Sequence, residues 1–141
     1  VNRGAIMCEE DKVFLLFGSI KKKIYKLINI KIKEYNLTAP EAIYLIVISK
    51  YESLSFKEIT SIVDYDKAMT TKVLNSLKDK EFVNNNIKNI VLTEKGYLVT
   101  NKVINELNLL KSEILGKVSK REINEFYKKL NQFNEILEGI C

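Results

Sequence analysis

The fold of this chain is decided between residues 66 and 96, which carry the sequence DKAMTTKVLNSLKDKEFVNNNIKNIVLTEKG. Asp66 can cap a helix that runs from Lys67 to Lys80, because its carboxylate can accept hydrogen bonds from the free backbone N–H groups of the first turn. One face of this helix is apolar, and its first turns are polar on the other face. We therefore expect the helix to pack on a core and to expose its N-terminal half.

A β-hairpin is expected immediately after this helix. Two short apolar strands, 82–83 and 87–92, are joined through the asparagines 84–86, and asparagine tolerates the left-handed conformation of a tight turn. Thr93 can then cap a long helix whose large apolar residues recur every three or four positions. The predicted order is therefore helix, hairpin, helix.

Two short helices precede this stretch. Residues 38–41 (TAPE) have the spacing of a capping box and predict a helix over 39–51. Residues 55–58 (SFKE) have the same spacing and predict a helix that ends at Val63. The connection 64–66 is tight, which suits two helices that cross at a steep angle. The sequence thus predicts a helix-turn-helix followed by a β-hairpin, which is the winged-helix arrangement.

Long amphipathic helices enclose this lobe. The first covers residues 11–35, and a capping box at Ser119 opens the last one, after a stop at Gly116. The terminal helices carry stripes of large apolar side chains that the small lobe cannot cover alone, namely Phe14, Phe17, Phe126, Phe133 and Leu137. We therefore predict an obligate homodimer, in which two subunits bury these stripes.

Composition argues against most other classes of protein. The 141 residues include no histidine, so the commonest general base and the commonest metal ligand are both missing, and we predict no enzyme activity, no metal site and no cofactor. The two cysteines, Cys8 and Cys141, lie at opposite ends, which is unlike a disulfide framework and favours a reducing cytoplasm. No apolar run approaches the ~18 residues that a membrane helix requires. The formal net charge of +5 favours a polyanionic partner.

The 67–80 helix is the candidate recognition helix. In a winged helix the second helix of the pair lies in the major groove, and the hairpin lies over the neighbouring backbone or minor groove. Lys72 can donate to guanine O6 or N7, Asn75 can pair with adenine, and Thr71 can contact thymine or a phosphate. We predict that DNA is contacted by Lys67, Met69, Thr71, Lys72 and Asn75 of this helix and by Lys88 of the hairpin. The alternative is an ordinary exposed polar helix face.

Three stretches resemble the MarR family of bacterial transcriptional regulators. They are residues 37–41 (LTAPE), 69–80 (MTTKVLNSLKDK) and 92–96 (LTEKG), and the last is the most specific match. In element order and length the resemblance covers nearly the whole chain from Met7. It implies a mainly α fold with a small β-hairpin, that is, a winged helix-turn-helix in a six-helix subunit of a dimer.

The resemblance also implies an organisation and a function. Residues 7–141 are expected to form a single domain, with a DNA-binding lobe at 38–96 and dimerisation helices at 11–36 and 97–140. Residues 1–6, which precede a methionine, are interpreted as a vector remnant or an alternative start. The homodimer is expected to be a sequence-specific transcriptional regulator, a repressor, that binds a near-palindromic operator in double-stranded DNA with each recognition helix in the major groove.

Two departures from the family's pattern concern the hairpin, or wing. Family members usually carry a longer hairpin with an Asp and Arg pair at its tip, whereas this hairpin is several residues shorter, contains no arginine and has Lys88 as its only charge. A short asparagine-rich tip can reach phosphates but offers little to a narrow minor groove, so we expect weaker or altered specificity. Glu81 occupies the place where the family often has glycine, so the turn into the wing is expected to differ.

The family often binds small aromatic or anionic effectors in a cleft between the dimerisation helices and the winged lobe. By this resemblance Tyr25, Tyr44 and Tyr51 are candidate effector-binding residues, and core packing is the alternative for each. Cys8 is interpreted as an incidental thiol, because acidic residues follow it directly. The lysines between 21 and 33 are interpreted as the solvated face of a dimer-forming helix, with a membrane-surface helix as the alternative.

Two functions remain open at this point. One is a DNA-binding dimeric regulator, and the other is a winged-helix module for protein interaction with weak or lost DNA binding. The dependence of binding affinity on salt distinguishes the two functions. DNA binding dominated by phosphate contacts weakens steeply as ionic strength rises, whereas the affinity of a protein contact formed by packed helices changes little.

Overall fold

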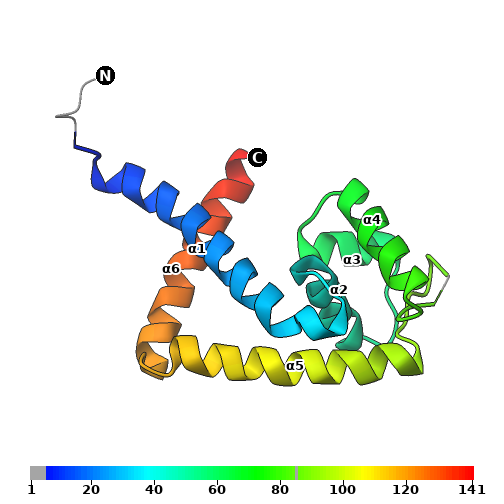
Figure 1. Ribbon diagram of the computed structural model, residues 1–141. Helices are drawn as coiled ribbons and strands as arrows, with labels where there is room; N and C mark the ends of the chain where they lie inside the picture. Colours follow the sequence, from blue (N-terminus) through cyan, green and yellow to red (C-terminus); the bar gives the residue numbers. More distant parts are fainter. Residues whose placement is uncertain (1–5, 85) are drawn as a thin grey trace. The chain divides into compact units, whose positions relative to one another are not determined.

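The computed structural model describes residues 6–84 and 86–141, and these divide into two compact units, one that ends at Glu106 and one from Leu107 to Cys141. Within the described residues there are six α-helices and one 3₁₀ helix (Figure 1). They are α1 (Glu9–Ile32), η1 (Lys33–Tyr35), α2 (Ala39–Ser49), α3 (Phe56–Val63), α4 (Lys67–Asp79), α5 (Glu94–Leu115) and α6 (Lys120–Ile140). The mainly α fold class with six helices is confirmed.

Local capping sets where the helices begin. The side chains of Thr38, Ser55 and Ser119 each close a capping box with the glutamate three residues later, as the sequence predicts. Asp66 caps α4 by accepting from the backbone N–H of Met69 at 2.7 Å. These caps satisfy backbone donors that have no partner inside the helix, which is why α2, α3, α4 and α6 start where they do.

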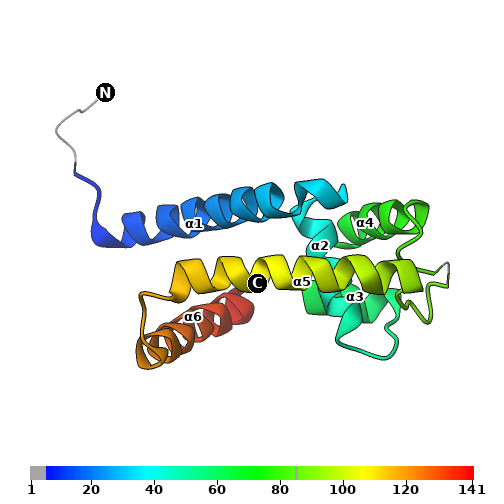
Figure 2. The same cartoon turned by 60° about the horizontal axis from the view of Figure 1, so that its bottom comes forward.

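Helix α2 is the centre of the first unit. It contacts α1, α3 and α4, and Figure 2 shows α1 running through η1 into α2, with α4 beside it. Tyr44, Leu45 and Ile48 of α2 are buried together with Ile59 of α3 and Leu77 of α4. The helix-turn-helix is therefore held by one apolar core around α2.

The turn between α3 and α4 is built by Asp64. This residue has a left-handed backbone with φ of 58° and ends α3. Aspartate adopts this conformation more readily than most side chains do, because its short polar group can bond locally. The predicted tight turn at 64–66 is thereby confirmed, and it brings α4 back across α3.

The wing differs from the two predicted strands, 82–83 and 87–92. Among the described residues it forms isolated antiparallel bridges, between Val83 and Leu92 and between Leu54 and Ile90. The side chain of Asn84 makes hydrogen bonds to backbone groups that a neighbouring strand would otherwise bind. Its amide nitrogen donates to the Asn89 carbonyl at 2.8 Å, and its amide oxygen accepts from the Val91 N–H at 3.0 Å. The predicted turn at 84–86 includes residue 85, which lies outside the described residues. Side-chain bonding thus shortens the hairpin that the apolar pattern suggested.

The signature at residues 92–96 joins the wing to α5. The Thr93 hydroxyl donates to the carbonyl of Glu81 at 2.6 Å and accepts from the N–H of Gly96 at 3.0 Å. Glu81 is left-handed, with φ of 65°, in the turn that follows α4. A Cβ atom on Gly96 would lie 2.0 Å from the Phe82 carbonyl oxygen, so only glycine lets α5 approach the turn this closely.

The second unit consists of the end of α5 and the whole of α6. The two helices are joined by a turn in which the Gly116 N–H donates to the Ser112 carbonyl at 2.8 Å, so the predicted stop is confirmed. Large apolar side chains are exposed along α6, among them Phe126, Ile136, Leu137 and Ile140. No helix in the described ranges is both long and apolar enough to span a membrane.

Candidate nucleic-acid interface

The outward face of α4 carries the predicted DNA contacts. Its exposed residues in the first three turns include Lys67, Thr71, Lys72 and Asn75, and Met69 is half-buried beside them. The opposite face is buried through Thr70, Val73 and Leu77, which recur at intervals of three and four. The structure therefore brings the five predicted α4 residues to the side of the helix away from the core.

Thr71 has its hydroxyl engaged within the helix. This group donates to the Lys67 carbonyl at 2.9 Å, so the methyl group is the part of the side chain best suited to an outside contact. Thymine presents a methyl group in the major groove, where it can make apolar contacts. Of the two contacts predicted for Thr71, the contact with thymine fits this geometry better than the contact with a phosphate.

The N-terminal half of α4 is anchored by a buried threonine that sequence analysis missed. The Thr70 side chain is fully buried, and its oxygen lies 2.9 Å from the Tyr44 hydroxyl of α2 and 3.0 Å from the Thr60 hydroxyl of α3. Thr70 also donates to the Asp66 carbonyl at 3.1 Å. Its position in the helix could have identified it, because Thr70 lies on the same face of α4 as the buried residues Val73 and Leu77.

A cluster of tyrosines lies next to this anchor. The ring of Tyr65 stacks on that of Tyr44, with centroids 5.9 Å apart and planes inclined by 2°. The Tyr65 hydroxyl is hydrogen-bonded to the hydroxyl of Tyr25 on α1. Burial raises the pKa of Tyr65, and the hydrogen bond with Tyr25 raises this pKa further. Burial also raises the pKa of Tyr44, against the opposing effect of its bond with Thr70. Tyr44 and Tyr65 therefore stay protonated at neutral pH.

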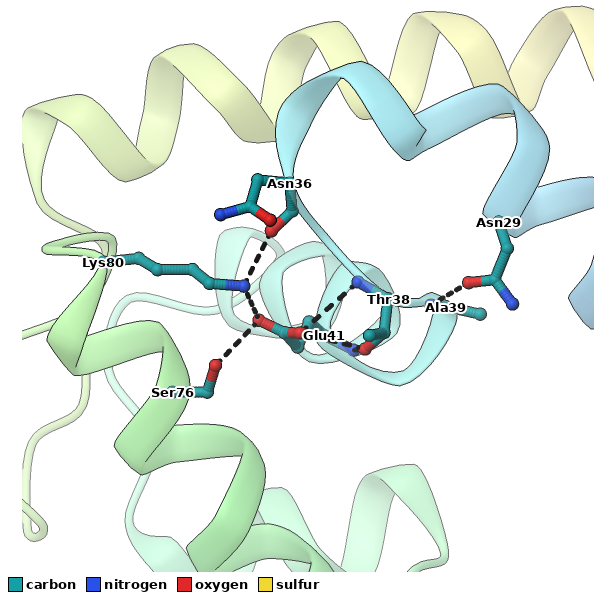
Figure 3. Close-up of polar contacts among 7 residues, drawn as sticks. All are labelled: Asn29, Asn36, Thr38, Ala39, Glu41, Ser76 and Lys80. Carbon is teal, nitrogen blue, oxygen red and sulfur yellow. Dashed lines mark hydrogen bonds and ion pairs between the residues drawn. The ribbon is translucent and has the colours of Figure 1, made fainter.

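The C-terminal end of α4 is anchored by an ion pair between the half-buried Lys80 and the buried carboxylate of Glu41 (Figure 3). The Lys80 ammonium donates to Glu41 Oε2 at 2.7 Å and to the Asn36 carbonyl at 2.7 Å. The Ser76 hydroxyl donates to the same carboxylate oxygen at 3.2 Å. The other oxygen, Oε1, accepts from the backbone N–H and the hydroxyl of Thr38 in the capping box. One carboxylate thus joins the start of α2 to the end of α4.

The wing presents Lys88 on a tethered turn. Its side chain is exposed, and its backbone N–H donates to the side-chain oxygen of Asn86 at 3.0 Å. The neighbouring Ile87 carbonyl accepts from the Phe56 N–H at 3.0 Å, which ties the turn to the start of α3. The wing is therefore short and locally braced, with its cation exposed.

The three candidate effector tyrosines have different surroundings. Tyr25 is half-buried, Tyr44 is fully buried, and Tyr51 is 48% exposed just after α2. Tyr25 and Tyr44 both contact Tyr65, which links them. Tyr51 follows Tyr44 by seven residues and lies beyond the end of α2 at Ser49. Core packing accounts for Tyr44, whereas Tyr25 lines an open groove.

This groove lies between α1 and the network at the end of α4. It has a volume of about 930 Å³ and is lined by α1 residues that include Tyr25 and Asn29, by residues 36–38, and by Glu41 and Lys80. We call it the basic groove, because its lining includes five lysines and one glutamate: Lys21, Lys22, Lys26, Lys33, Lys80 and Glu41. Glu41 is already paired with Lys80, so the remaining charge in the groove is positive.

Comparison with known proteins identifies relatives. No family model matches the chain. The HTH-type transcriptional regulator SarZ of Staphylococcus aureus is 30% identical over 135 residues, which cover 85% of this chain and 84% of SarZ.

Solved structures share the fold at lower identity. S. aureus MarR in complex with salicylate and kanamycin has a TM-score of 0.80 and 22% identity, and the match covers 94% of each chain. The S. aureus MepR–DNA complex has a TM-score of 0.85 and 15% identity, and covers 92% of this chain and 99% of MepR. Because SarZ, a MarR-family member, is 30% identical over most of both chains, and because these folds agree, this chain belongs to the MarR family of winged helix-turn-helix transcriptional regulators.

Proposed function

We propose that this protein is a repressor that binds a near-palindromic operator as a homodimer, with α4 of each subunit in the major groove. The observation that carries the proposal is the exposed polar face of α4, with Lys67, Thr71, Lys72 and Asn75, on a helix anchored at both ends. A recognition helix needs such anchoring because base contacts tolerate little error in position. The similar protein MepR was solved in complex with DNA, which supports this proposal.

The apolar faces of the terminal helices support the homodimer. Phe14 and Leu15 of α1 are 67% and 63% exposed in one subunit, and Phe126 and Leu137 of α6 are 61% and 52% exposed. Apolar faces of this extent are covered in stable proteins, and a two-fold dimer covers the same surface on both subunits. A dimer also sets two α4 helices at the spacing of two half-sites.

Base discrimination is assigned to Lys72 and Asn75. Replacing either with alanine is expected to weaken binding to the specific operator by roughly 1 to 3 kcal/mol per half-site and to relax the preference at one base pair. Titration of operator variants, followed by fluorescence anisotropy, measures both effects. Lys102→Ala, which removes an exposed cation from α5, is the matched control and should leave the preference intact. Unchanged discrimination in both α4 variants would mean that α4 is not the recognition helix.

The wing is assigned a contact with phosphate through Lys88. Lys88→Ala is expected to weaken specific and random duplexes almost equally, and to lower the slope of log affinity against log salt by about one unit per lost phosphate contact, or about two per dimer. The measurement is a salt titration with both duplexes. A selective loss on A·T-rich flanks at an unchanged slope would instead place Lys88 in the minor groove.

The basic groove is proposed to bind a small aromatic or anionic effector. Its lysines supply the charge, and Tyr25 supplies an aromatic ring over which Lys21 lies at 5.6 Å. The similar S. aureus MarR was solved with salicylate, so salicylate is a suitable probe. Heteronuclear NMR should show shifts centred on Tyr25 and Asn29 when salicylate is added. Shifts centred on Tyr51 would move the site to the turn after α2.

The short wing favours one alternative, a winged-helix module that binds protein. The two functions differ in their response to salt, because binding to DNA releases counterions. A repressor should lose affinity for its own upstream DNA by orders of magnitude as salt rises. Failure to bind that DNA above the level of random competitor, even at low salt, would favour the protein-binding alternative.

A further inference from the structure

The positive charge of this chain is concentrated in one short stretch of α1. Residues 21–33 contain six lysines and no acidic residue, whereas the rest of the chain has 17 basic and 18 acidic residues. The winged lobe, residues 38–96, has eight lysines and eight acidic residues, so its formal net charge is zero. Affinity for DNA depends on cations that replace the counterions of the phosphates. The lobe that carries the recognition helix therefore has no excess of the charge that DNA binding needs.

Four of the α1 lysines lie on one face of the helix. They line the basic groove, their side chains are exposed, and we call them the α1 lysine face: Lys21, Lys22, Lys26 and Lys33. In the part of the chain that the structure describes, none of the four forms an ion pair. In the winged lobe, by contrast, Lys80 is paired with Glu41 and Lys95 with Glu81. The charge of the α1 lysine face is therefore available to an outside anion.

The α1 lysine face begins beside the recognition helix. Lys33 lines the same groove as Lys80, which directly follows α4. Lys21 lies twelve residues before Lys33 in α1, which is about 18 Å along the helix axis. Phe14, which the proposed homodimer buries, lies further along the same helix (Figure 2). The α1 lysine face therefore lies between α4 and the proposed dimer contact.

This position matches the geometry of a two-part operator. The half-sites of a dimer lie about 34 Å apart, so the distance from one half-site to the two-fold axis is about 17 Å. A row of cations about 18 Å long on each subunit is enough to follow the DNA between the half-sites. The phosphates of that segment are the anions nearest to both recognition helices.

We propose that the α1 lysine face binds the phosphates of operator DNA between the two half-sites, and that it supplies affinity while α4 supplies sequence preference. This inference rests on the proposed function, because it assumes a dimer with α4 in the major groove. Lysine is a compact cation that binds phosphate as a point charge, and phosphate contacts carry no direct sequence information. The central segment of the operator is therefore held without being read.

An anionic membrane is the other polyanionic surface that a lysine-rich helix can bind. Such a helix inserts its apolar face into the lipid. In α1 this apolar face includes Ile28 and Ile32, which are buried in the first unit. The half of α1 that carries the lysines thus has its apolar face packed on protein, and the structure favours DNA.

A triple variant, Lys21→Gln with Lys22→Gln and Lys26→Gln, tests the contact. It is expected to lower the slope of log affinity against log salt by about five units per dimer, because each of three lost contacts in two subunits contributes about 0.9. Specific and random duplexes should weaken almost equally, so the base preference survives. Anisotropy titrations with upstream DNA measure this, without salicylate because the same lysines line the basic groove.

Neutral phosphates locate the contact on the DNA. Once footprinting has placed the half-sites, methylphosphonates replace the phosphates between them. The wild-type protein should lose affinity for this duplex by at least 10-fold, whereas the triple variant should lose less than two-fold, because its contacts are already absent. Methylphosphonates within the half-sites should weaken both proteins alike.

Two further variants separate local contact from net charge and from folding. Lys102→Gln with Lys111→Gln and Lys129→Gln removes the same charge from exposed positions on α5 and α6, and it should lower the salt slope by less than one unit. The triple arginine variant at positions 21, 22 and 26 keeps the charge and should bind as the wild-type protein does. Urea unfolding should show the glutamine variant to be as stable as the wild-type protein, because the replaced side chains are exposed.

The outcomes distinguish failure of this inference from failure of the proposed function. A salt slope of the α1 triple variant within one unit of the wild-type value, or an equal loss in the α5 and α6 control, would overturn the inference while sequence-specific binding stands. An equal effect of the central methylphosphonates on both proteins would do the same. Binding to phosphatidylglycerol vesicles that only the α1 triple variant loses, with its DNA affinity unchanged, would assign the face to a membrane instead. A wild-type protein that binds upstream DNA no better than random duplex would overturn the proposed function, and the inference with it.

Discussion

Gly96→Ala is expected to lower the free energy of unfolding by about 3 kcal/mol, the upper end of what overpacking usually costs. The added Cβ would lie 2.0 Å from the carbonyl oxygen of Phe82, and this oxygen belongs to the backbone, so it cannot move aside as a flexible side chain could. The same carbonyl accepts from the Thr93 N–H at 3.0 Å, so relieving the clash would break the junction of wing and α5. Urea unfolding at one fixed protein concentration measures the change.

Gly18→Ala is the matched control for this prediction. Gly18 also lies in a helix, α1, but a Cβ there would meet no atom within 4 Å. Alanine should therefore stabilise the protein by about 0.5 to 1 kcal/mol, because it restricts the unfolded chain more than glycine does. If Gly96→Ala were as stable as the wild-type protein, the close approach of α5 to Phe82 would be wrong.

Phe14→Glu combined with Leu137→Glu is expected to convert the protein to a monomer and to weaken operator binding by about 100-fold or more. Both side chains are more than half exposed in one subunit, so the charges should be tolerated by the isolated fold but not by a buried dimer interface. Two linked binding modules gain a factor of about 10² to 10⁴ over one module, and a monomer loses this gain. Sedimentation velocity and anisotropy measure the two effects.

The control for this prediction is Tyr51→Glu, which places the same charge on an aromatic residue that is 48% exposed after α2. It should remain dimeric and retain its operator affinity. A double variant that sediments as a dimer and keeps full affinity would show that α1 and α6 do not form the interface, and the proposed homodimer would then need another surface.

The starts of the capped helices could be predicted from sequence because the interactions that set them are local. Each capping box joins residues three apart, and the Asp66 cap joins residues of one turn, so a short window contains both partners. The signature at 92–96 was informative for the same reason: Thr93 caps α5 through the N–H of Gly96 within the motif. Such contacts do not depend on how the rest of the chain folds.

The details of the wing could not be predicted from its apolar pattern. Ile90 pairs with Leu54, which lies far away in the sequence, and the Asn84 side chain occupies backbone positions that a strand would have used. Hydrophobic patterning predicts which residues face the core but not which hydrogen-bond partner an amide chooses. The two strands were therefore predicted longer than the bridges that form.

Tertiary structure alone decided the distant partner of Glu41. Its backbone N–H and Oε1 close the capping box with Thr38, as the sequence predicts, but Oε2 binds Lys80, which lies 39 residues further along the chain. From sequence Lys80 was the last residue of the candidate recognition helix, and Tyr44 was a candidate effector contact. Packing of α4 on α2 makes Lys80 an anchor and buries Tyr44 against Thr70. Local interactions thus determined where the helices lie along the chain, whereas contacts between distant residues, which depend on how the helices pack, decided which side chains hold the recognition helix in place.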